Sequence, residues 1–269
     1  MSDPRPIGLF DSGVGGLTVL DAVARRFPHE DLLYLGDTAR LPYGTKSPET
    51  VKRYSTRAVA FLLARGVKAV VVACNTASSL ALDEMIALSP VPVIGVVEPG
   101  ARAAVRAAAG TTAPIAVLAT EATVASDAYG RAIRALEPGR DVLHVACPLF
   151  VPLAEEGWTD NEVADAAAKR YLGPVAASGA RVVVLGCTHY PLLAATIARA
   201  LPAGTILVDS AAEAAATLVS TLPEGSWAPA GEEHGETHLL VTDASARLGR
   251  VAGRFLGREA AVLELVDLP

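Results

Sequence analysis

Two of the three cysteines have the setting expected of groups that exchange a proton with a substrate. Cys74 in ACNTAS and Cys187 in GCTHYP each follow a Val-rich segment and precede hydroxyl or amide residues that could cap a helix. A helix N-terminus favours the reactive thiolate form of cysteine. A buried cysteine is more often a small apolar residue of the core, and we assign Cys147, in HVACPLF, to that role. The matched settings of the other two favour a chemical role for Cys74 and Cys187.

A glycine-rich segment, DSGVGGLT at residues 11–18, directly follows the first apolar run. Its glycines would let the backbone approach a ligand, and free N–H groups at the start of the following helix would bind an anion. It is neither a dinucleotide-binding fingerprint, since the sixth position is Thr18, nor a P-loop, since the Gly-Lys-Ser/Thr ending is absent. The alternative is a tight turn without a ligand. Asp11 at its start is a candidate for positioning an amine or perturbing a thiol.

Other polar residues are weaker candidates when the residues alone are considered. His189 lies two residues after Cys187, where an imidazole could stabilise a thiolate or act as an acid. Glu155 and Glu156 either reach a cleft or belong to a solvated helix, and their own sequence context favours the solvated helix. The loop LGDTARLPYGTKS, residues 35–47, is either a functional loop or a plain turn.

The sequence gives no support for a metal or a cofactor. In HGETH, His234 and His238 are four residues apart, but Gly follows the first His where the zinc signature H-E-x-x-H needs Glu. The four lysines lack the apolar setting that a Schiff-base cofactor would need; they are Lys46, Lys52, Lys68 and Lys169. We therefore expect neither a metal nor a cofactor.

Composition and charge narrow the class of protein. Of 269 residues, 51% are hydrophobic and 19% are charged, which excludes a disordered chain. The net charge of −6 argues against nucleic acid or an anionic membrane surface as the main partner. No run of 18 apolar residues predicts a membrane span, and the start MSDPRPIGLFD does not resemble a signal peptide. Three cysteines without C-x-x-C spacing indicate free thiols in a reducing cytoplasm.

Short apolar runs alternate with longer segments of helical spacing, which predicts an α/β fold with mostly parallel sheets. Each run has the continuous apolar pattern of a strand buried on both faces. The predicted strands are residues 7–10, 32–36, 69–73, 91–97, 114–119, 142–146, 182–186, 205–209, 238–241 and 261–266. The clearest predicted helices are residues 48–65, 98–109, 160–177 and 210–221.

The chain also repeats itself, since Cys187 follows Cys74 by 113 residues in a similar segment: GVKAVVVACNT matches GARVVVLGCTH. In the same order, PIGLFDS at 6–12 matches PIAVLAT at 114–120, and VPVIG at 91–95 matches GTILV at 204–208. We infer two similar, pseudosymmetric α/β halves. Because ligands bind beyond the carboxyl ends of parallel strands, the two cysteines would face a common cleft from opposite sides.

Four motifs, FDSGVGGLTVL, YLGDTARLPYGTKS, ACNTAS and GCTHYPLL, resemble in this order those of the glutamate racemases, in the aspartate/glutamate racemase superfamily. The resemblance extends over essentially the whole chain and includes CPLFVPLAEEG and VDSA. Ser79 and Ala119 depart from the pattern, where the family usually has Ala and Gly. The resemblance implies a cofactor-independent isomerase that interconverts L- and D-glutamate with two thiols and supplies D-glutamate for peptidoglycan.

Carried over residue by residue, the resemblance implies that Cys74 deprotonates D-glutamate and Cys187 deprotonates L-glutamate. Asp11 would assist Cys74. His189 would assist Cys187 together with one of the two adjacent glutamates, of which we prefer Glu155. Substrate contacts would fall on Asp11, Ser12, Tyr43, Gly44, Asn75, Thr76, Thr120, Thr188 and His189. Two thiols also suit the chemistry, because racemisation removes a proton from one face of Cα and returns one to the other.

The resemblance also predicts a first domain of residues 1–97 plus 207–269 and a second domain of residues 98–206. It implies a cytoplasmic homodimer with L-/D-glutamate as its small-molecule substrate, and neither nucleic acid nor a membrane as partner. Because the first predicted strand begins at residue 7, the long N-terminal extension of members activated by a peptidoglycan precursor is missing. We therefore expect no such activation.

Two other functions stay open. An aspartate or hydantoin racemase would share the two-cysteine plan, although the loops DSGVGGLT and YGTKS favour glutamate. A non-catalytic protein that binds an amino acid between two lobes would have no need of paired thiols.

Overall fold

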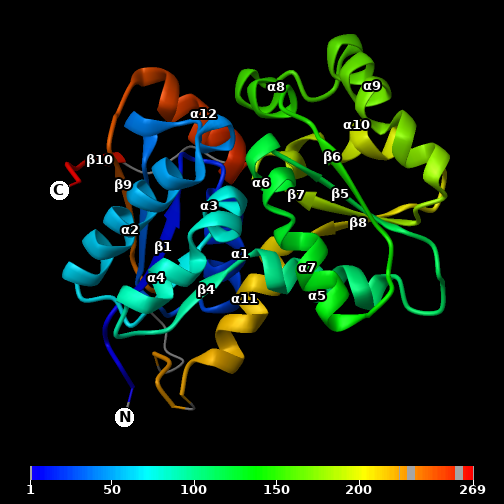
Figure 1. Cartoon of the computed structure of the whole chain (residues 1–269). Helices are drawn as coiled ribbons and strands as arrows, with labels where there is room; N and C mark the ends of the chain where they lie inside the picture. Colours follow the sequence, from blue (N-terminus) through cyan, green and yellow to red (C-terminus); the bar gives the residue numbers. More distant parts are fainter. Residues whose placement is uncertain (1, 224, 229–233, 258–262, 269) are drawn as a thin grey trace.

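The computed structural model describes residues 2–223, 225–228, 234–257 and 263–268. In these residues the strands form two sheets in which every pair of neighbours is parallel (Figure 1). The first sheet has the order β10 (Leu263–Leu265), β9 (Thr237–Val241), β2 (Leu32–Gly36), β1 (Ile7–Asp11), β3 (Ala69–Val72) and β4 (Val93–Gly95). The second has the order β6 (Val142–Ala146), β5 (Ile115–Ala119), β7 (Val182–Gly186) and β8 (Ile206–Asp209).

The two sheets repeat one arrangement of four strands. The order β2-β1-β3-β4 in the first sheet corresponds to β6-β5-β7-β8 in the second. The registers agree as well, since Ile7 of β1 is paired with Ala69 of β3, and Ile115 of β5 with Val182 of β7. The strands matched by the sequence repeat, β1 with β5, β3 with β7 and β4 with β8, therefore occupy equivalent places.

Helices cover both faces of each sheet, as the four apolar clusters of the core show. On the first sheet, one face packs against α1 (Leu17–Arg26), α11 (Ser210–Thr221) and α12 (Ala246–Leu256), and the other against α2 (Pro48–Ala64), α3 (Asn75–Leu80) and α4 (Leu82–Leu88). On the second sheet, one face packs against α8 (Phe150–Glu156), α9 (Glu162–Ser178) and α10 (Ala194–Arg199), and the other against α5 (Val97–Ala107) and α7 (Ala128–Leu136). The remaining helices are α6 (Glu121–Ser126), η1 (Thr38–Arg40), η2 (Tyr43–Thr45) and η3 (Tyr190–Leu193).

The α/β fold with parallel sheets is confirmed, and each apolar run predicted as a strand contains one. The four predicted helices are also present, with ends that differ by two residues or fewer. For the last predicted strand, residues 261 and 262 lie outside the described part of the chain, and β10 occupies Leu263–Leu265. The prediction succeeded because strands that are buried on both faces appear in the sequence as continuous apolar runs. The fully buried strands are β1, β2, β3, β5 and β7.

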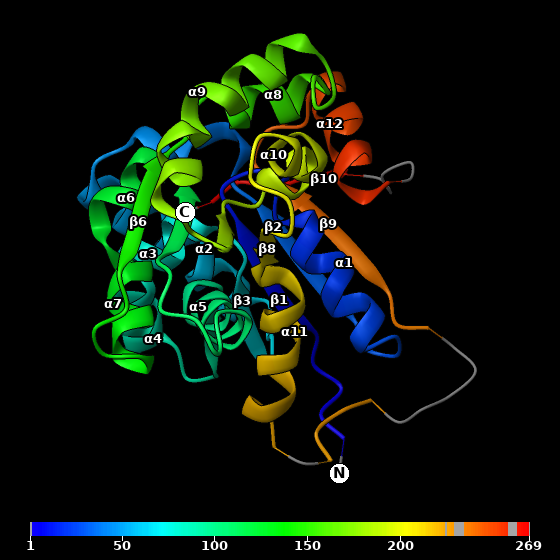
Figure 2. The same cartoon turned by 90° about the vertical axis from the view of Figure 1, so that its right-hand side faces the viewer.

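We propose the same two domains as the sequence indicated, with one boundary moved. The predicted boundary between residues 206 and 207 would cut β8 after its first residue. Because β8 pairs along its length with β7 of the second sheet, we place this boundary after Asp209, where α11 begins. Helix α11 then packs against α1, which covers the first sheet, and against α5, which covers the second sheet (Figure 2).

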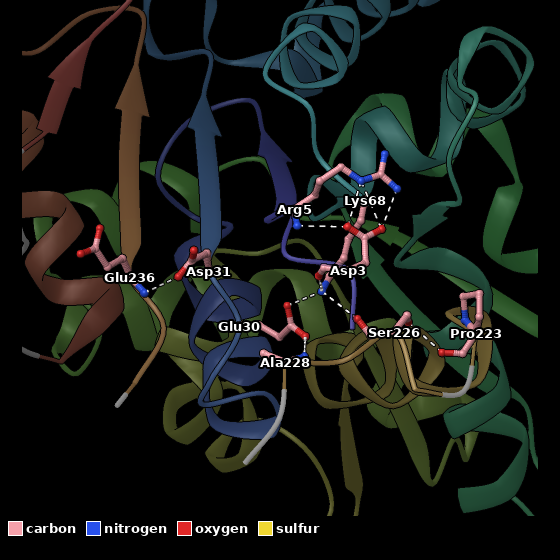
Figure 3. Close-up of polar contacts among 9 residues, drawn as sticks. All are labelled: Asp3, Arg5, Glu30, Asp31, Lys68, Pro223, Ser226, Ala228 and Glu236. Atoms are coloured by element: carbon pink, nitrogen blue, oxygen red, sulfur yellow. Dashed lines mark hydrogen bonds and ion pairs between the residues drawn. The ribbon is translucent and has the colours of Figure 1, made fainter. Parts of the chain in front are cut away.

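A buried ion pair joins separate segments at the amino ends of the first sheet (Figure 3). Lys68, just before β3, lies 2.5 Å from Glu30, and both side chains are almost fully buried. The Lys68 ammonium also donates to the backbone carbonyls of Asp3, at 2.8 Å, and Ser226, at 3.2 Å. Glu30 accepts a further bond from the N–H of Ala228. This network lies at the edge of the sheet opposite to the one where Cys74 follows β3.

Candidate active site

A cavity of about 760 Å³, including its open mouth, lies where the carboxyl ends of the two sheets meet. Cavities of this size commonly hold small-molecule ligands. All the residues that the resemblance implied line it except Asp11, which lies just behind: Ser12, Tyr43, Gly44, Cys74, Asn75, Thr76, Thr120, Glu155, Cys187, Thr188 and His189. The structure therefore brings together residues that follow β1, β3, β5 and β7 with residues of η2 and α8, which are far apart in the sequence.

Cys74 enters the cavity from the first sheet, between β3 and α3. It caps α3, since its sulfur accepts a bond from the N–H of Ala77 at 3.4 Å, and its thiol donates to Ser12 Oγ, also at 3.4 Å. The predicted helix start is thus present, but the cap is Cys74 itself, and the predicted capping residues Asn75 and Thr76 are the first two residues of α3. The expected effect of the helix end on the thiol is also wrong: burial and the nearby Asp11 charge raise the pKa of Cys74 to about 12. Cys74 is therefore a thiol at neutral pH.

Asp11 ends β1 and is fully buried beneath the glycine loop. One carboxyl oxygen, Oδ2, accepts bonds from the N–H groups of Gly13 and Gly16, each at 3.1 Å. The other, Oδ1, has no hydrogen-bond partner among the described residues. Burial raises the pKa of Asp11, and the charge of His189 and these backbone bonds oppose that rise.

The glycines of the loop allow it to approach Asp11 and the second sheet closely. A Cβ atom on Gly16 would lie 2.6 Å from Cβ of Asp11. A Cβ atom on Gly15 would lie 2.3 Å from Oγ1 of Thr188 and 2.7 Å from the ring of His189. All three distances are shorter than real contacts of a Cβ atom. The loop therefore needs glycine because the two halves of the site meet across it.

Cys187 enters from the second sheet and is accompanied by a buried histidine and a carboxylate. Its sulfur lies 3.8 Å from Nδ1 of His189, whose Nε2 lies 3.5 Å from Oε1 of Glu155. Burial lowers the pKa of His189, but hydrogen bonds to Cys187 and Glu155 outweigh it and raise this pKa to about 10. His189 is therefore an imidazolium at neutral pH. The predicted capping by Thr188 is wrong, since only the short helix η3 follows and it begins after His189 without a side-chain cap.

Comparison with known proteins identifies this arrangement. A family model described as Asp/Glu/Hydantoin racemase matches residues 14–218. The glutamate racemase of Geobacter metallireducens is 50% identical to the chain over 265 residues, which cover 98% of the chain and 97% of that protein.

The chain belongs to the aspartate/glutamate/hydantoin racemase family. It is therefore an isomerase.

Solved structures agree with the fold of this racemase. The glutamate racemase of Thermus thermophilus, in complex with β-chloro-D-alanine, has a TM-score of 0.87 at 45% identity and covers 99% of both chains. That of Francisella tularensis, in complex with D-glutamate, has a TM-score of 0.91 at 35% identity and covers 98% of both. An aspartate racemase from Picrophilus torridus, at 15% identity and a TM-score of 0.59, shares the fold alone.

The two halves of the racemase site are joined by hydroxyl and amide groups. Oγ1 of Thr76, in α3, lies 3.0 Å from Oγ1 of Thr120, at the end of β5. The Tyr129 hydroxyl, from α7, donates to Oδ1 of Asn75 at 2.6 Å, so the Asn75 N–H₂ group is left to face other partners. Gly44 packs against Thr120, since a Cβ atom on it would lie 2.7 Å from that side chain. These contacts hold the polar wall of the cavity across both sheets.

Sequence reasoning missed the residues that act behind this wall. Tyr129 is one, because nothing in its own segment indicates a contact with Asn75. Asp37 is another: it is fully buried and accepts a 2.6 Å bond from the Tyr43 hydroxyl, which orients that ring at the cavity. Asp37 follows β2 directly, and a carboxylate at the carboxyl end of a buried strand could have drawn attention to it.

The other sequence assignments are resolved as follows. Glu155 lines the cavity and contacts His189, whereas Glu156 does not line it, so the geometry agrees with the preference for Glu155. Cys147 is fully buried in the apolar cluster of the second sheet, as predicted. No cluster of metal-binding side chains occurs within residues 2–223, 225–228, 234–257 and 263–268. In the same residues, no helix has the length and apolar character needed to cross a membrane.

Proposed function

We propose that this racemase interconverts L- and D-glutamate without a cofactor, with Cys74 and Cys187 as the two groups that transfer protons. The observation that carries the proposal is that both thiols line one cavity, each from the carboxyl end of its own sheet. Racemisation exchanges the proton on Cα between opposite faces, and a base on each side does this without turning the substrate over. The repeated strand order supplies two such positions.

In the direction from L to D, the Cys187 thiolate removes the α-proton of L-glutamate, and the electron pair of the C–H bond remains on the substrate as a carbanion. The Cys74 thiol then donates its proton to the opposite face, which gives D-glutamate, a Cys187 thiol and a Cys74 thiolate. The reaction from D to L follows the same steps in reverse. Proton exchange with water returns the enzyme to its starting form.

The electrostatics of the two sides support this direction of transfer. Because burial and Asp11 raise the pKa of Cys74 to about 12, Cys74 keeps its proton until a strong base, the carbanion, forms beside it. Across the cavity, imidazolium His189 can donate a hydrogen bond to a Cys187 thiolate. Asp11 and His189 thus assist opposite thiols, and Glu155 assists through His189.

Polar groups of the cavity wall are suited to holding the substrate and its developing charge. The α-proton of an amino acid is very weakly acidic, so the carbanion must share its charge with the carboxylate. Donors from both sheets are available for this: Ser12, Asn75, Thr76, Thr120 and Thr188. We propose that they bind the carboxylates and the amine of glutamate together with Asp11, Tyr43, Gly44 and His189.

Glutamate is favoured as substrate over aspartate by the similarity of the chain to proteins of each kind. Relatives named glutamate racemase are 41–50% identical over 96% or more of both chains. The sequence identity to the aspartate racemase of Picrophilus torridus is only 15%. The proposed physiological role is to supply D-glutamate for peptidoglycan, in the cytoplasm, which suits three free cysteines. A homodimer stays a prediction.

The purified protein should racemise D-glutamate in the presence of a chelator and without added cofactor, so that its circular dichroism decays to zero. Cys74→Ser and Cys187→Ser should each lower the rate by about 10³-fold or more, because each removes one of two required proton carriers. Cys147→Ser is the matched control and should keep the rate within a few-fold. A flat trace from folded, reduced protein would contradict the proposal, and so would an unchanged rate in either variant.

The same assay separates the alternatives. If aspartate turned over faster than glutamate, the chain would be an aspartate racemase with the same two-thiol chemistry. If glutamate bound with equal affinity to the wild type and both serine variants but was never racemised, the chain would be a binding protein.

A further inference from the structure

Helix α12 belongs to the first sheet's layer but reaches the catalytic side of the second sheet. It follows β9 and packs against α1, and in both views it lies beside α8 (Figures 1 and 2). The ring of Phe255 meets the ring of His189 edge-on, with centroids 5.0 Å apart. The helix therefore touches the group that accompanies Cys187.

Two arginines of α12 hold the end of α8, which carries Glu155. Arg254 donates to the backbone carbonyl of Glu155 and packs against Gly157. Two turns earlier, Arg247 Nη2 lies 3.6 Å from Oε2 of Glu155 and 2.7 Å from Oε1 of Glu156. Arg254 thus holds the backbone of Glu155, and Arg247 forms an ion pair with its side chain while it hydrogen-bonds Glu156.

The carboxylate of Glu155 is shared between two cations on opposite sides. Its Oε1 faces Nε2 of His189 at 3.5 Å, and its Oε2 faces Arg247. The side chain is 23% exposed, so without a second partner it could rotate toward solvent. A carboxylate on Nε2 fixes the orientation of the imidazole, in which Nδ1 lies 3.8 Å from the Cys187 sulfur and 3.3 Å from Oγ1 of Thr188.

We propose that Arg247 is a positioning residue for proton transfer at Cys187, which it serves by holding Glu155 against His189. This inference deepens the proposed function and rests on it. The hydrogen bond to His189, the charge of His189 and the charge of Arg247 together keep the pKa of Glu155 below its usual range despite partial burial. The other charged groups facing the pair are Glu156, Arg250 and Arg254 beside Glu155, and Asp11 beside His189.

Arg247→Gln should lower kcat by roughly 3- to 10-fold, because it removes a partly exposed ion pair that positions Glu155 but substitutes no side chain that touches the substrate. Arg247→Lys should lower kcat less than Arg247→Gln does, since lysine keeps the positive charge but lacks the planar guanidinium group. Arg250→Gln is the matched control. Arg250 lies on the same helix, and its guanidinium donates a hydrogen bond to the backbone carbonyl of Ala246.

A substrate isotope effect distinguishes positioning at Cys187 from a general weakening of the fold. The equilibrium constant between the enantiomers is 1, so any loss in kcat/KM must be equal in the two directions. The value of kcat/KM alone therefore does not show whether proton transfer at Cys187 or at Cys74 has become slower. With α-deuterated L-glutamate, Cys187 breaks the C–D bond, and Arg247→Gln should increase the isotope effect on kcat/KM. With α-deuterated D-glutamate, Cys74 breaks that bond, and the isotope effect should decrease.

Equal isotope effects in the variant and the wild type would overturn the inference, as would a loss in Arg250→Gln as large as that in Arg247→Gln. Both outcomes require wild-type protein that racemises glutamate. Absence of racemisation in the wild type would instead contradict the proposed function itself. Thermal melts of all three variants show whether the fold is retained, and the isotope effects are measured on the folded fraction.

Discussion

Cys74 and Cys187 hold equivalent places in two repeated halves, yet their surroundings differ in charge. Cys74 lies near buried Asp11, and its pKa is raised to about 12. Cys187 lies beside His189, an imidazolium that forms an ion pair with Glu155. A racemase with two identical thiols would have no preferred resting proton. In the proposed mechanism, the raised pKa of Cys74 favours the form of the enzyme in which Cys74 carries the proton and L-glutamate is accepted.

His189 gives a pH-dependent prediction. Its ordinary pKa of 6.5 is raised to about 10 in the folded protein, so the folded state binds the proton more tightly than the unfolded state. Its contribution to stability is complete below pH 6.5 and is lost as the pH rises through 10. His189→Asn should cost about 1.5–3 kcal/mol at pH 6, the range for hydrogen bonds to charged groups, and less at pH 10.

Urea unfolding of the wild type and His189→Asn at several pH values measures this difference. A difference in unfolding free energy that stays constant from pH 6 to pH 10 would show that His189 carries no extra proton in the folded state.

At the residue scale, the sequence predicted which side chains meet but not what their environment does to them. The motifs predicted that Cys74, Cys187 and His189 lie together, and all three line one cavity. The pKa of Cys74 could not be predicted, because the helix end it caps lowers this pKa while burial, known only from the fold, raises it more. Likewise, the contact of Tyr129 with Asn75 joins segments 54 positions apart, and local pattern carries no trace of it.

At the scale of elements, the glycine loop between β1 and α1 is a contact surface between the two halves. Gly15→Ala would place a methyl group 2.3 Å from Oγ1 of Thr188 and 2.7 Å from the His189 ring. The variant should remain folded and lose roughly 10- to 100-fold in kcat/KM, because small displacements of reacting groups cost this much. Circular dichroism of the fold and the racemisation assay measure the two effects.

Gly173→Ala is the matched control for this prediction. Gly173 lies on an exposed part of α9, and a Cβ atom there meets nothing within 4 Å. Pro174 follows directly and disfavours helical backbone for a residue with a Cβ atom, which offsets the usual gain from alanine. Alanine should therefore change the stability by less than about 1 kcal/mol and leave activity unchanged. If Gly15→Ala behaved like Gly173→Ala, the loop would not be the close contact described.

Elements were the part of the fold that the sequence predicted best. Strands such as β3 and β7 are buried on both faces, so they appear as unbroken Val-rich runs, and the repeat of such runs predicted the repeated strand order. The end of the second domain was harder to place. The register of β8 against β7 is a tertiary contact, so the local pattern could not indicate the boundary that we propose after Asp209.

At the scale of the whole molecule, the proposed active site and a buried ion pair lie at opposite edges of the first sheet. The carboxyl edge forms the cavity, and the amino edge is closed by the Lys68–Glu30 pair (Figure 3). Lys68→Met would leave Glu30 buried without its cation and should lower the unfolding free energy by about 3–5 kcal/mol. At temperatures where the variant is folded, kcat and KM should be unchanged.

Replacing both partners checks this account of the ion pair. In Lys68→Met/Glu30→Leu no charge is left buried, so the double variant should be more stable than Lys68→Met alone. A double variant that is less stable than either single variant would show that the pair itself is not what stabilises the amino edge.

Deuterium incorporation tests the two-thiol mechanism most directly. L-glutamate is incubated with the enzyme in D₂O, the reaction is stopped after a few per cent of conversion, and the separated enantiomers are analysed by mass spectrometry. Two thiols on opposite faces predict that the D-glutamate formed carries deuterium at Cα while the recovered L-glutamate carries none. Deuterium in the recovered L-glutamate at a comparable level, or protium retained in the D-glutamate, would mean that one group serves both faces and would contradict the assignment of Cys74 and Cys187.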